Sequence, residues 1–478
     1  MAEVKPRMMR GLRDLFPEDM HAREWIVSTI RGVYENYGYV PLATPAMEYL
    51  DVLSGSAGEE TQKELFTVAG PGEEPLGLRF DQTVPLARVV AQYRDLPRPF
   101  RRYQVAPVWR CEMRPNEKRG RLREFTQFDI DAVGVKSEVA DVEMITAMCD
   151  TMDALGVAKY RVRVSSRRVL NLLLPHAGID TDRAHDVFRV LDKLEKLGPE
   201  KVRLELTTGY KDESGAPIRG QGFSDAQVDR IDEFLAIQSD RRDDVLAQVR
   251  SLFEDVPGSD AELDVLANMS RQLSTLGYGD DRVMFDPRLA RGLAYYTGTV
   301  FECVLLDLPK FGAIGGGGRY DELVMRFLGE RVPAVGTSFG VDRLLIALQD
   351  LGRAPARKAT AQVLVTVFDR KMMDHYLSMT YELRRAGIRT ELYLGNAKRV
   401  GKQVEYGDKY EVPILVICGG DEAEKGIVQL KDMSVGREKT GEIKDRDEWK
   451  SERPGQFEVP RDKLVEEIKK LLATIEGE

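Results

Sequence analysis

The chain has 478 residues, of which 42% are hydrophobic and 31% are charged, and its net charge is -9. This length exceeds one ordinary hydrophobic core, so two or three domains are expected, and the acidic balance excludes a purely electrostatic nucleic-acid binder. No stretch approaches the roughly 20 apolar residues that cross a bilayer. The charged N-terminus also lacks the apolar core of a secretory signal, so we expect a cytoplasmic protein without a membrane partner.

The first predicted elements belong to a mixed domain. Apolar positions recur at helical spacing from Glu18 to Tyr37, and Gly38 closes the pattern. The next segment, GYVPLATPAMEY, contains two prolines, which favour an edge or interface strand. Alternating apolar residues then predict strands at 104–108, 125–133, 159–164 and 300–306. An antiparallel sheet with flanking helices accounts for these elements most simply.

Two further regions differ in character. Charged helical patterns between about Asp180 and Asp280 indicate a separate helical subdomain, and the basic segment Gly352 to Thr360 is typical of a linker. Beyond it, VLVTVF, RTELYL, PILVIC and GIVQLKD alternate with helical runs, which predicts a compact α/β domain with a largely parallel sheet. We therefore divide the chain at 1–180, 181–280, 281–352 and 361–478.

The four cysteines and four histidines show no CxxC or HxxxH spacing, so no metal site built from protein residues is predicted. A basic segment is more informative. Between Arg98 and Arg123 there are nine basic residues and two glutamates, a pattern that neutralises phosphates. Arginine forks bind phosphate oxygens bidentately, and Phe125 is available to stack on a purine. A nucleoside triphosphate site is therefore favoured over a plain surface hairpin.

Two segments in the second half of the chain also bear on ligand binding. The run RGLAYYTGTVFE, from Arg291 to Glu302, places a cation and two phenols where they can hold an anion and a small polar ring. The glycines from Gly315 to Gly318 lack both the P-loop and the Rossmann spacing. They allow the backbone to approach a ligand closely, and a structural turn is a nearly equal alternative.

Together these motifs resemble the histidyl-tRNA synthetases, which are class IIa aminoacyl-tRNA synthetases. GYVPLATPAMEYLDVL, with Pro45, is similar to motif 1; the hairpin from Arg110 to Phe125 is similar to motif 2; and GTSFGVDRLL, with Arg343, is similar to motif 3. The resemblance implies an α+β fold: a class II antiparallel sheet with flanking helices, a helical insertion and a C-terminal α/β anticodon-binding domain. It also implies a homodimer formed through motif 1.

The resemblance assigns roles by position. Asp81, Thr83 and Gln127 would hold the α-ammonium group of L-histidine. Asp131 and one of Tyr295 or Tyr296 would face the imidazole, and Gly316 belongs to a wall of the same pocket. The ATP-binding residues would be Arg110, Glu112, Arg121, Phe125 and Arg343. Arg291 and Arg110 would be the catalytic residues, acting on the α-phosphate. The substrates would be histidine, ATP with Mg2+, and tRNA(His).

The sequence departs from the family in places and leaves alternatives open. Ala294 replaces a common acidic residue, and FDQT is closer to archaeal and eukaryotic members than to many bacterial ones. Without the family resemblance, Asp131 is equally well explained as a strand-end cap, and Tyr295 is equally well explained as an ordinary core residue. The main rival function is a histidine-sensing regulatory subunit of ATP phosphoribosyltransferase, which charges no tRNA. A synthetase for proline, threonine or glycine leaves the tyrosine pair and Asp131 unexplained.

Overall fold

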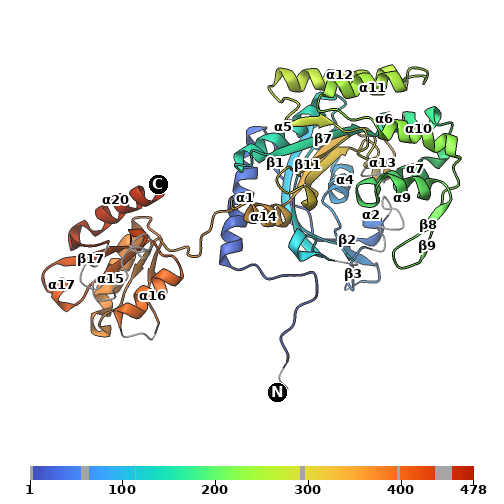
Figure 1. Ribbon diagram of the computed structural model, residues 1–478. Coiled ribbons are helices and arrows are strands. Elements are labelled where there is room, and N and C mark those ends of the chain that lie inside the picture. The colour runs from blue at the N-terminus through green and yellow to red at the C-terminus, as the bar shows by residue number, and fades with distance from the viewer. Residues whose placement is uncertain are drawn as a thin grey trace. The chain divides into compact units, whose positions relative to one another are not determined.

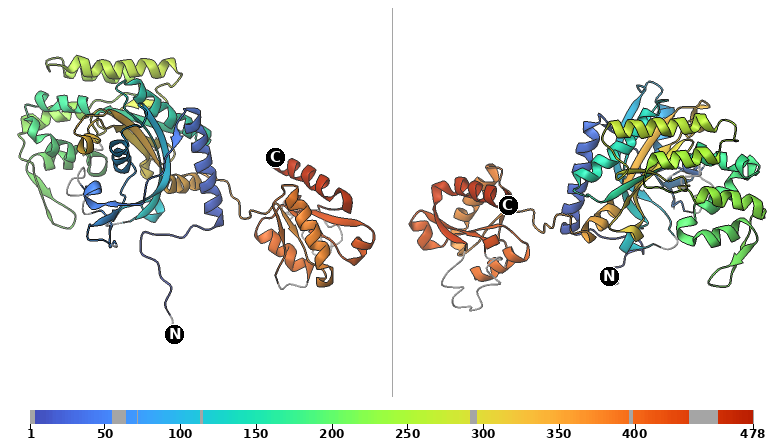
Figure 2. Two further views of the ribbon diagram at one scale, coloured as in Figure 1. Left: turned by 180° about the vertical axis from the view of Figure 1, so that it is seen from behind. Right: turned by 45° about the horizontal axis from the view of Figure 1, so that its top comes forward.

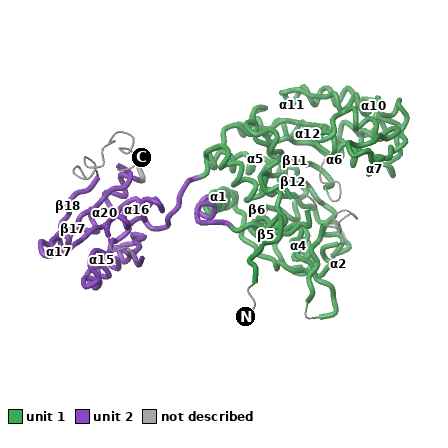
Figure 3. Tube along the Cα trace, turned by 60° about the horizontal axis from the view of Figure 1, so that its bottom comes forward, with its two compact units in different colours: residues 1–14, 23–354 green, residues 15–22, 355–478 purple. Residues whose placement is uncertain are grey.

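A computed structural model describes residues 4–54, 64–70, 72–112, 115–290, 296–395, 399–435 and 455–477. The chain forms two compact units (Figure 3): residues 1–14 with 23–354, and residues 15–22 with 355–478. No helix within the described ranges has the length and apolar character that crossing a membrane requires.

An eight-stranded sheet runs through the first unit (Figure 1). Its strands, in spatial order, are β1 (Val40–Pro41), β5 (Phe100–Trp109), β6 (Glu124–Val133), β13 (Ala334–Gly340), β12 (Ala313–Arg319), β11 (Thr299–Leu305), β7 (Tyr160–Ser166) and β10 (Val283–Phe285). The strands from β5 to β7 pair antiparallel, while the edge strands β1 and β10 pair parallel. The predicted antiparallel sheet is confirmed, and the proline-containing strand lies at its edge.

Strand alternation gives this sheet two unlike faces near β5 and β6. Phe128 and Ile130 are fully buried on one face, where Tyr34 packs edge-on against Phe128 with ring centroids 5.2 Å apart. Tyr34 belongs to α1 (Pro17–Asn36), which a hydrogen bond from Tyr37 to Asp150 joins to α5 (Val139–Ala154). Since successive side chains point to opposite faces, Gln127, Asp129 and Asp131 lie together on the other face.

That polar face is bordered by smaller elements. The helix α4 (Thr83–Gln92) is fastened to β6 because the Gln82 side chain donates to the Gln127 carbonyl over 2.9 Å. The helix α14 (Val341–Asp350) continues directly from β13. The remaining short elements near them are β2 (Met47–Tyr49), β3 (Thr67–Val68) and β4 (Leu76–Leu78), which form a small sheet, with α2 (Leu50–Ser54) and α13 (Met325–Leu328).

The region from about Asp180 to Asp280 is mainly helical, as predicted, and helices begin before it, at Arg167. From Arg167 the chain forms α6 (Arg167–His176), α7 (Ala184–Leu191), α8 (Leu194–Leu197), α9 (Pro199–Leu206), the hairpin of β8 (Gly209–Lys211) and β9 (Pro217–Arg219), α10 (Asp225–Leu235), α11 (Arg242–Leu252) and α12 (Ser259–Thr275). Helices α11 and α12 run side by side (Figure 2), and α12 also packs against α5 and α6. Our division of the first unit at 180, 280 and 352 stays a prediction.

The second unit has a mixed sheet. Its order is β15 (Thr390–Leu392), β14 (Val363–Val365), β16 (Ile414–Ile417), β17 (Ile427–Asp432) and β18 (Gln456–Pro460), flanked by α15 (Met373–Arg385), α16 (Val400–Lys409), α17 (Gly420–Glu424) and α20 (Leu464–Gly477). β14 pairs parallel with β15 and β16, but β17 and β18 pair antiparallel. The predicted largely parallel sheet is therefore wrong for β17, because residues 418–426 are too few for a parallel crossover. The sequence pattern did not predict β18.

A buried ion pair connects the sheet of the first unit to α5. Arg319, at the end of β12, places its Nε 3.1 Å from Oδ2 of Asp141, and both side chains are almost completely buried. The same guanidinium donates to the carbonyls of Val135 and Ser137. Removing one member of such a pair leaves the other charge buried without compensation.

We predict that Asp141→Ala lowers the free energy of unfolding by about 3 to 5 kcal/mol. Urea unfolding followed by circular dichroism measures the change. The matched control is Asp260→Ala, because Asp260 pairs with Arg250 at an exposed site and should contribute less than about 1 kcal/mol. Equal effects of the two substitutions would contradict the prediction.

Candidate active site

A cavity of about 230 Å³ lies on the polar face of the sheet; we call it the carboxylate cavity. It is walled by the start of α4, by β6, by the glycine strand β12 and by β13. Many residues selected from the sequence line it: Asp81, Thr83, Arg110, Gln127, Asp131, Tyr296, Gly316 and Arg343. The fold thus brings together segments that are far apart in the chain.

Asp131 is held firmly at the far end of this cavity. Its Oδ2 lies 2.8 Å from Nη2 of the fully buried Arg102, and the Tyr320 hydroxyl donates to its Oδ1. A methyl group on Gly336 would come within 2.0 Å of that Oδ1, so glycine there makes room for the carboxylate. Asp131 lies inside β6, which shows that the strand-end-cap interpretation is wrong.

Asp129 is a cavity residue that our sequence analysis missed. It lies two residues before Asp131 on the same face of β6 and is only 3% exposed. Burial raises the pKa of Asp129 to about 7; Asp131 and Asp81 add to the rise, while Arg102 and the Ser338 hydroxyl oppose it. The signal that would have found it is the alternation Gln-x-Asp-x-Asp in a strand, which puts three polar groups on one face.

The near end of the cavity is formed by Asp81, Thr83 and Gln127. Oδ1 of Asp81 accepts a hydrogen bond of 3.0 Å from the backbone N–H of Val84, in the first turn of α4. Burial raises the pKa of Asp81 above its ordinary value. The Gln127 amide donates to the Ser338 hydroxyl over 3.2 Å. These contacts fix a carboxylate and an amide near each other at one end of the cavity.

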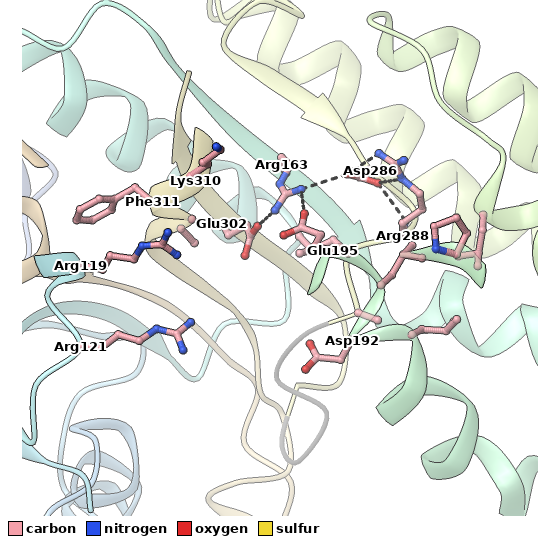
Figure 4. A pocket seen from close by; sticks show the side chains of 18 of the residues that line it. Arg119, Arg121, Arg163, Asp192, Glu195, Asp286, Arg288, Glu302, Lys310 and Phe311 are labelled. Carbon is pink, nitrogen blue, oxygen red and sulfur yellow. Dashed lines mark hydrogen bonds and ion pairs between the residues drawn. The ribbon is translucent and has the colours of Figure 1, made fainter. Parts of the chain in front are cut away.

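A second cavity, of about 690 Å³, shares Ala313 and Arg343 with the first; we call it the arginine cavity (Figure 4). Arg119 and Arg121, from the turn between β5 and β6, lie on one side of it with Lys310 and Phe311. Among the residues that the structure describes, none of these three cations is ion-paired to a carboxylate. They are therefore available to an anionic ligand.

On the opposite side of the arginine cavity, carboxylates outnumber the cations that they contact. Arg163 on β7 contacts the carboxylates of Glu302 and Glu195, and its Nη1 lies 3.6 Å from Oδ2 of Asp286. Arg288 is in turn 2.9 Å from Asp286. These two arginines and three carboxylates (Figure 4) leave this side without net positive charge. Sequence reasoning did not find this network, because its members come from strands and loops that are distant in the chain.

Arg110 reaches the carboxylate cavity between two aromatic rings. Its guanidinium carbon lies 4.3 Å from the ring centre of Phe80 and 5.1 Å from that of Phe125. Such contacts fix the guanidinium plane. Phe125 and Glu112 do not line either cavity in the described part of the chain, so stacking of Phe125 on a purine stays a prediction.

Arg343 is anchored at the junction of the two cavities. It donates to the Phe311 carbonyl and lies over the Phe311 ring. Gly120, with φ of +64°, lets the hairpin turn pack against the backbone of Arg343; a methyl group there would lie 2.7 Å from its Cα. This close contact positions the arginine-bearing turn beside motif 3.

Two sequence-selected residues, Arg291 and Tyr295, lie outside the described residues, and their roles stay predictions. The glycine strand is described. Methyl groups on Gly315 and Gly317 would meet the Phe339 ring and the Gly336 carbonyl, at 2.6 and 2.0 Å. Neighbouring strands therefore require glycine at these two positions.

Comparison with known protein families shows to which family this chain belongs. Residues 11–344 match the family described as histidyl-tRNA synthetase, and residues 362–471 match the anticodon binding domain. The chain belongs to the histidyl-tRNA synthetase family. This confirms the resemblance inferred from the motifs.

Similar proteins support the same relationship. The histidine–tRNA ligases of Ruegeria sp. (strain TM1040) and Paracoccus denitrificans (strain Pd 1222) are 42% and 41% identical to this chain. The alignments cover 97% and 98% of this chain, and 96% and 98% of those proteins. The crystal structure of histidyl-tRNA synthetase from Nostoc sp. PCC 7120 superimposes with a TM-score of 0.79 at 32% identity, covering 98% of this chain and all of that one. The predicted class II fold with its C-terminal α/β domain is therefore confirmed.

The high pKa of Asp129 has a consequence for stability. A carboxyl group whose folded-state pKa is raised contributes stability that is fully present below its unfolded pKa, near 4, and is lost as the pH rises through its folded pKa of about 7. The charged or titratable groups that act on Asp129 are Arg102 on β5, Asp131 on β6, Asp81 before α4, Arg79 after β4 and Tyr34 on α1.

We therefore predict that Asp129→Asn stabilises the ligand-free protein relative to wild type, and that the gain is at least about 1 kcal/mol larger at pH 8 than at pH 5. Urea unfolding at the two pH values measures it. Asp240→Asn, at an exposed site, is the control and should show no such pH dependence. A gain that is independent of pH would mean that Asp129 does not titrate in this range.

Proposed function

We propose that this protein activates L-histidine with ATP to form histidyl-adenylate and then transfers the histidyl group to the 3' end of tRNA(His). The observation that carries the proposal is the pair of adjoining cavities. One presents carboxylates and an amide to a small polar amino acid, and the other presents unbalanced arginine and lysine charge to a triphosphate. Full-length identity above 40% to histidine–tRNA ligases supports the same activity.

In the carboxylate cavity, Asp81, Thr83 and Gln127 would bind the α-ammonium group of histidine. Asp131, with Tyr295 or Tyr296, would face the imidazole, and Gly316 would form part of the wall. An ammonium ion needs acceptors, which the first group provides. The substrate carboxylate would then point toward Arg110, at the side where the two cavities meet.

Arg121 and Arg343, which line the arginine cavity, would bind the phosphates together with Arg110 from the adjoining carboxylate cavity. Glu112 and Phe125, which line neither cavity, would contact the rest of the ATP molecule. The substrate carboxylate attacks the α-phosphorus, a new P–O bond forms, and pyrophosphate leaves with the electron pair of the broken bond. Negative charge crowds around phosphorus in this transition state, so Arg291 and Arg110 would act by fixed charge. The reaction requires no side-chain nucleophile.

A Mg2+ ion would accompany ATP. The described residues contain no group of three carboxylate, histidine or cysteine side chains that could hold a metal by themselves. However, Mg2+ on a nucleotide commonly takes only one or two protein carboxylates together with phosphate oxygens and water. Glu302 is buried at the wall of the arginine cavity, where it contacts Arg163, and it would have to exchange that contact for the ion. The ion would neutralise phosphate charge.

The partners would be tRNA(His) and a second copy of the chain, and the site of action would be the cytoplasm. The second unit, which matches the anticodon binding domain, would bind the tRNA. The motif 1 segment would form the dimer interface. Its large apolar side chains support this, because Val40, Met47 and Tyr49 are each about half exposed, at 50%, 51% and 50%.

The regulatory-subunit alternative has less support. A structure described as an ATP phosphoribosyltransferase regulatory subunit/histidyl-tRNA synthetase, from Bacillus halodurans C, has a TM-score of 0.68 but only 23% identity, covering 84% of this chain and 97% of that one. That likeness supports a shared fold alone. The present chain retains the anticodon-binding unit together with Arg110 and Arg343.

An exchange assay tests the proposed activity. We predict that the protein catalyses ATP–pyrophosphate exchange with L-histidine and with none of the other standard amino acids, and that it charges tRNA(His). Exchange with proline, threonine or glycine would indicate another synthetase. Binding of histidine without any exchange would favour the sensor function.

Arg110→Lys tests the role of the motif 2 arginine. Lysine keeps the charge but cannot form two parallel hydrogen bonds or stack between Phe80 and Phe125. We expect the rate of adenylate formation to fall by about 100-fold or more, with histidine affinity changed much less. Single-turnover kinetics and calorimetry separate the two effects. Arg250→Lys, on the exposed side of α11, is the control; equal rates for both variants would remove Arg110 from the mechanism.

A further inference from the structure

The N-terminal segment from Arg10 to Arg13 lies along the hairpin that joins β5 and β6. The backbone N–H of Arg123 donates to the Gly11 carbonyl over 2.8 Å, and its side chain donates to the carbonyls of Arg10 and Glu112 over 3.1 and 3.0 Å. Gly11 has φ of +84°, and a methyl group there would lie 3.0 Å from Cγ of Arg123. The segment is therefore fastened closely to the hairpin.

The end of this segment reaches the start of α14. Nη2 of Arg13 lies 2.9 Å from Oδ1 of Asp342, whose other oxygen accepts a hydrogen bond of 2.6 Å from the backbone N–H of Thr126 on β6. Asp342 is buried and only 5% exposed. A buried carboxylate that loses its cation keeps the cost of desolvation without compensation. Asp342 thus joins α14 to β6 while Arg13 balances its charge.

The neighbours of this contact belong to the proposed ATP site. Arg343 follows Asp342 directly in α14, and Phe125 precedes Thr126 on β6. Arg343 lines both cavities, whereas neither Arg13 nor Asp342 lines either of them. The pair can therefore act on a nucleotide only through other residues. Such support matters, because a displacement of about 1 Å in a binding group can cost about 100-fold in rate.

We propose that Arg13 and Asp342 are positioning residues for ATP. Their ion pair holds the helix that carries Arg343 against the strand that ends motif 2, so the N-terminal segment supports the nucleotide site without contacting the nucleotide. The inference rests on the proposed function, because it assumes that ATP binds to Arg343 and the hairpin. It concerns the ATP side of the site, so histidine affinity should change much less.

The test compares Arg13→Ala and Arg13→Lys with wild type in ATP–pyrophosphate exchange with L-histidine. We expect the KM for ATP to rise by about 10-fold in Arg13→Ala, with a smaller fall in kcat. Arg13→Lys should recover most of the loss, because lysine restores a cation beside Asp342. Calorimetry should give an unchanged dissociation constant for histidine. Arg7→Ala, at an exposed position of the same segment, is the control and should match wild type.

Asp342→Asn tests the same pair from its other member. The amide oxygen of asparagine can still accept the hydrogen bond from Thr126, but the charge that pairs with Arg13 is gone. We expect the KM for ATP to rise as it does in Arg13→Ala. The double variant should show one such rise and not the product of two, because both substitutions break the same ion pair.

Three results would overturn the inference: an unchanged KM for ATP in Arg13→Ala, equal losses for ATP and histidine, or effects that multiply in the double variant. If Arg13→Ala cannot be purified, Arg13→Gln takes its place in the same comparison. Failure of the proposed function is distinguishable, because wild type would then show no histidine-dependent exchange. Calorimetric dissociation constants for ATP would in that case test the pair by themselves.

Discussion

The site depends on one electrostatic constraint: two carboxylates, Asp129 and Asp131, are buried on one face of one strand, and the guanidinium of Arg102 is buried beside them. Burying ionised groups is costly unless they are paired. Arg102 pairs with Asp131, while burial raises the pKa of Asp129 to about 7. Oδ1 of Asp129 and Oδ2 of Asp131 are buried without a hydrogen-bond partner among the described residues. The cavity therefore suits a ligand that brings N–H donors and positive charge.

The surrounding sheet is adapted to this arrangement through its glycines. Gly336 leaves the space that the Asp131 carboxylate occupies, and Gly317 lets β12 and β13 approach closely. Side chains at these positions would displace the carboxylate or separate the strands. Glycine in a strand interior normally weakens a sheet, so its repetition in β12 and β13 indicates that cavity geometry outweighs strand stability here.

Much of the fold was predictable from the sequence, because it rests on local patterns. Alternating residues predicted β5, β6, β7 and β11, and the prolines predicted an edge strand. The antiparallel pairing of β17 was missed, since pairing direction depends on the connection between strands, and β18 was not predicted at all. The burial of β17 alternates along its length, which is typical of a strand with one solvated face, and this pattern argued against the parallel interpretation.

The candidate site was predictable where a motif named its residues and was missed where only tertiary contacts define them. Asp81, Gln127 and Asp131 line one cavity as expected, but Asp129 was overlooked although the same strand carries it. Arg102 was also missed. In the sequence Arg102 is only one of several basic residues between Arg98 and Arg123. In the structure it pairs with Asp131, whereas its neighbour Arg101 lies on the other face of β5 and pairs with Glu143.

The charge distribution in the arginine cavity follows from which elements contribute to it. The helical region supplies Glu195, which with Glu302 and Asp286 neutralises Arg163, while the hairpin turn supplies Arg119 and Arg121 without carboxylate partners among the described residues. A triphosphate is attracted to unbalanced charge rather than to arginine as such. Under the proposed function, the phosphates would therefore lie toward the hairpin and Arg343, where the carboxylate cavity begins. The amino-acid carboxylate and the α-phosphorus would then meet at that junction.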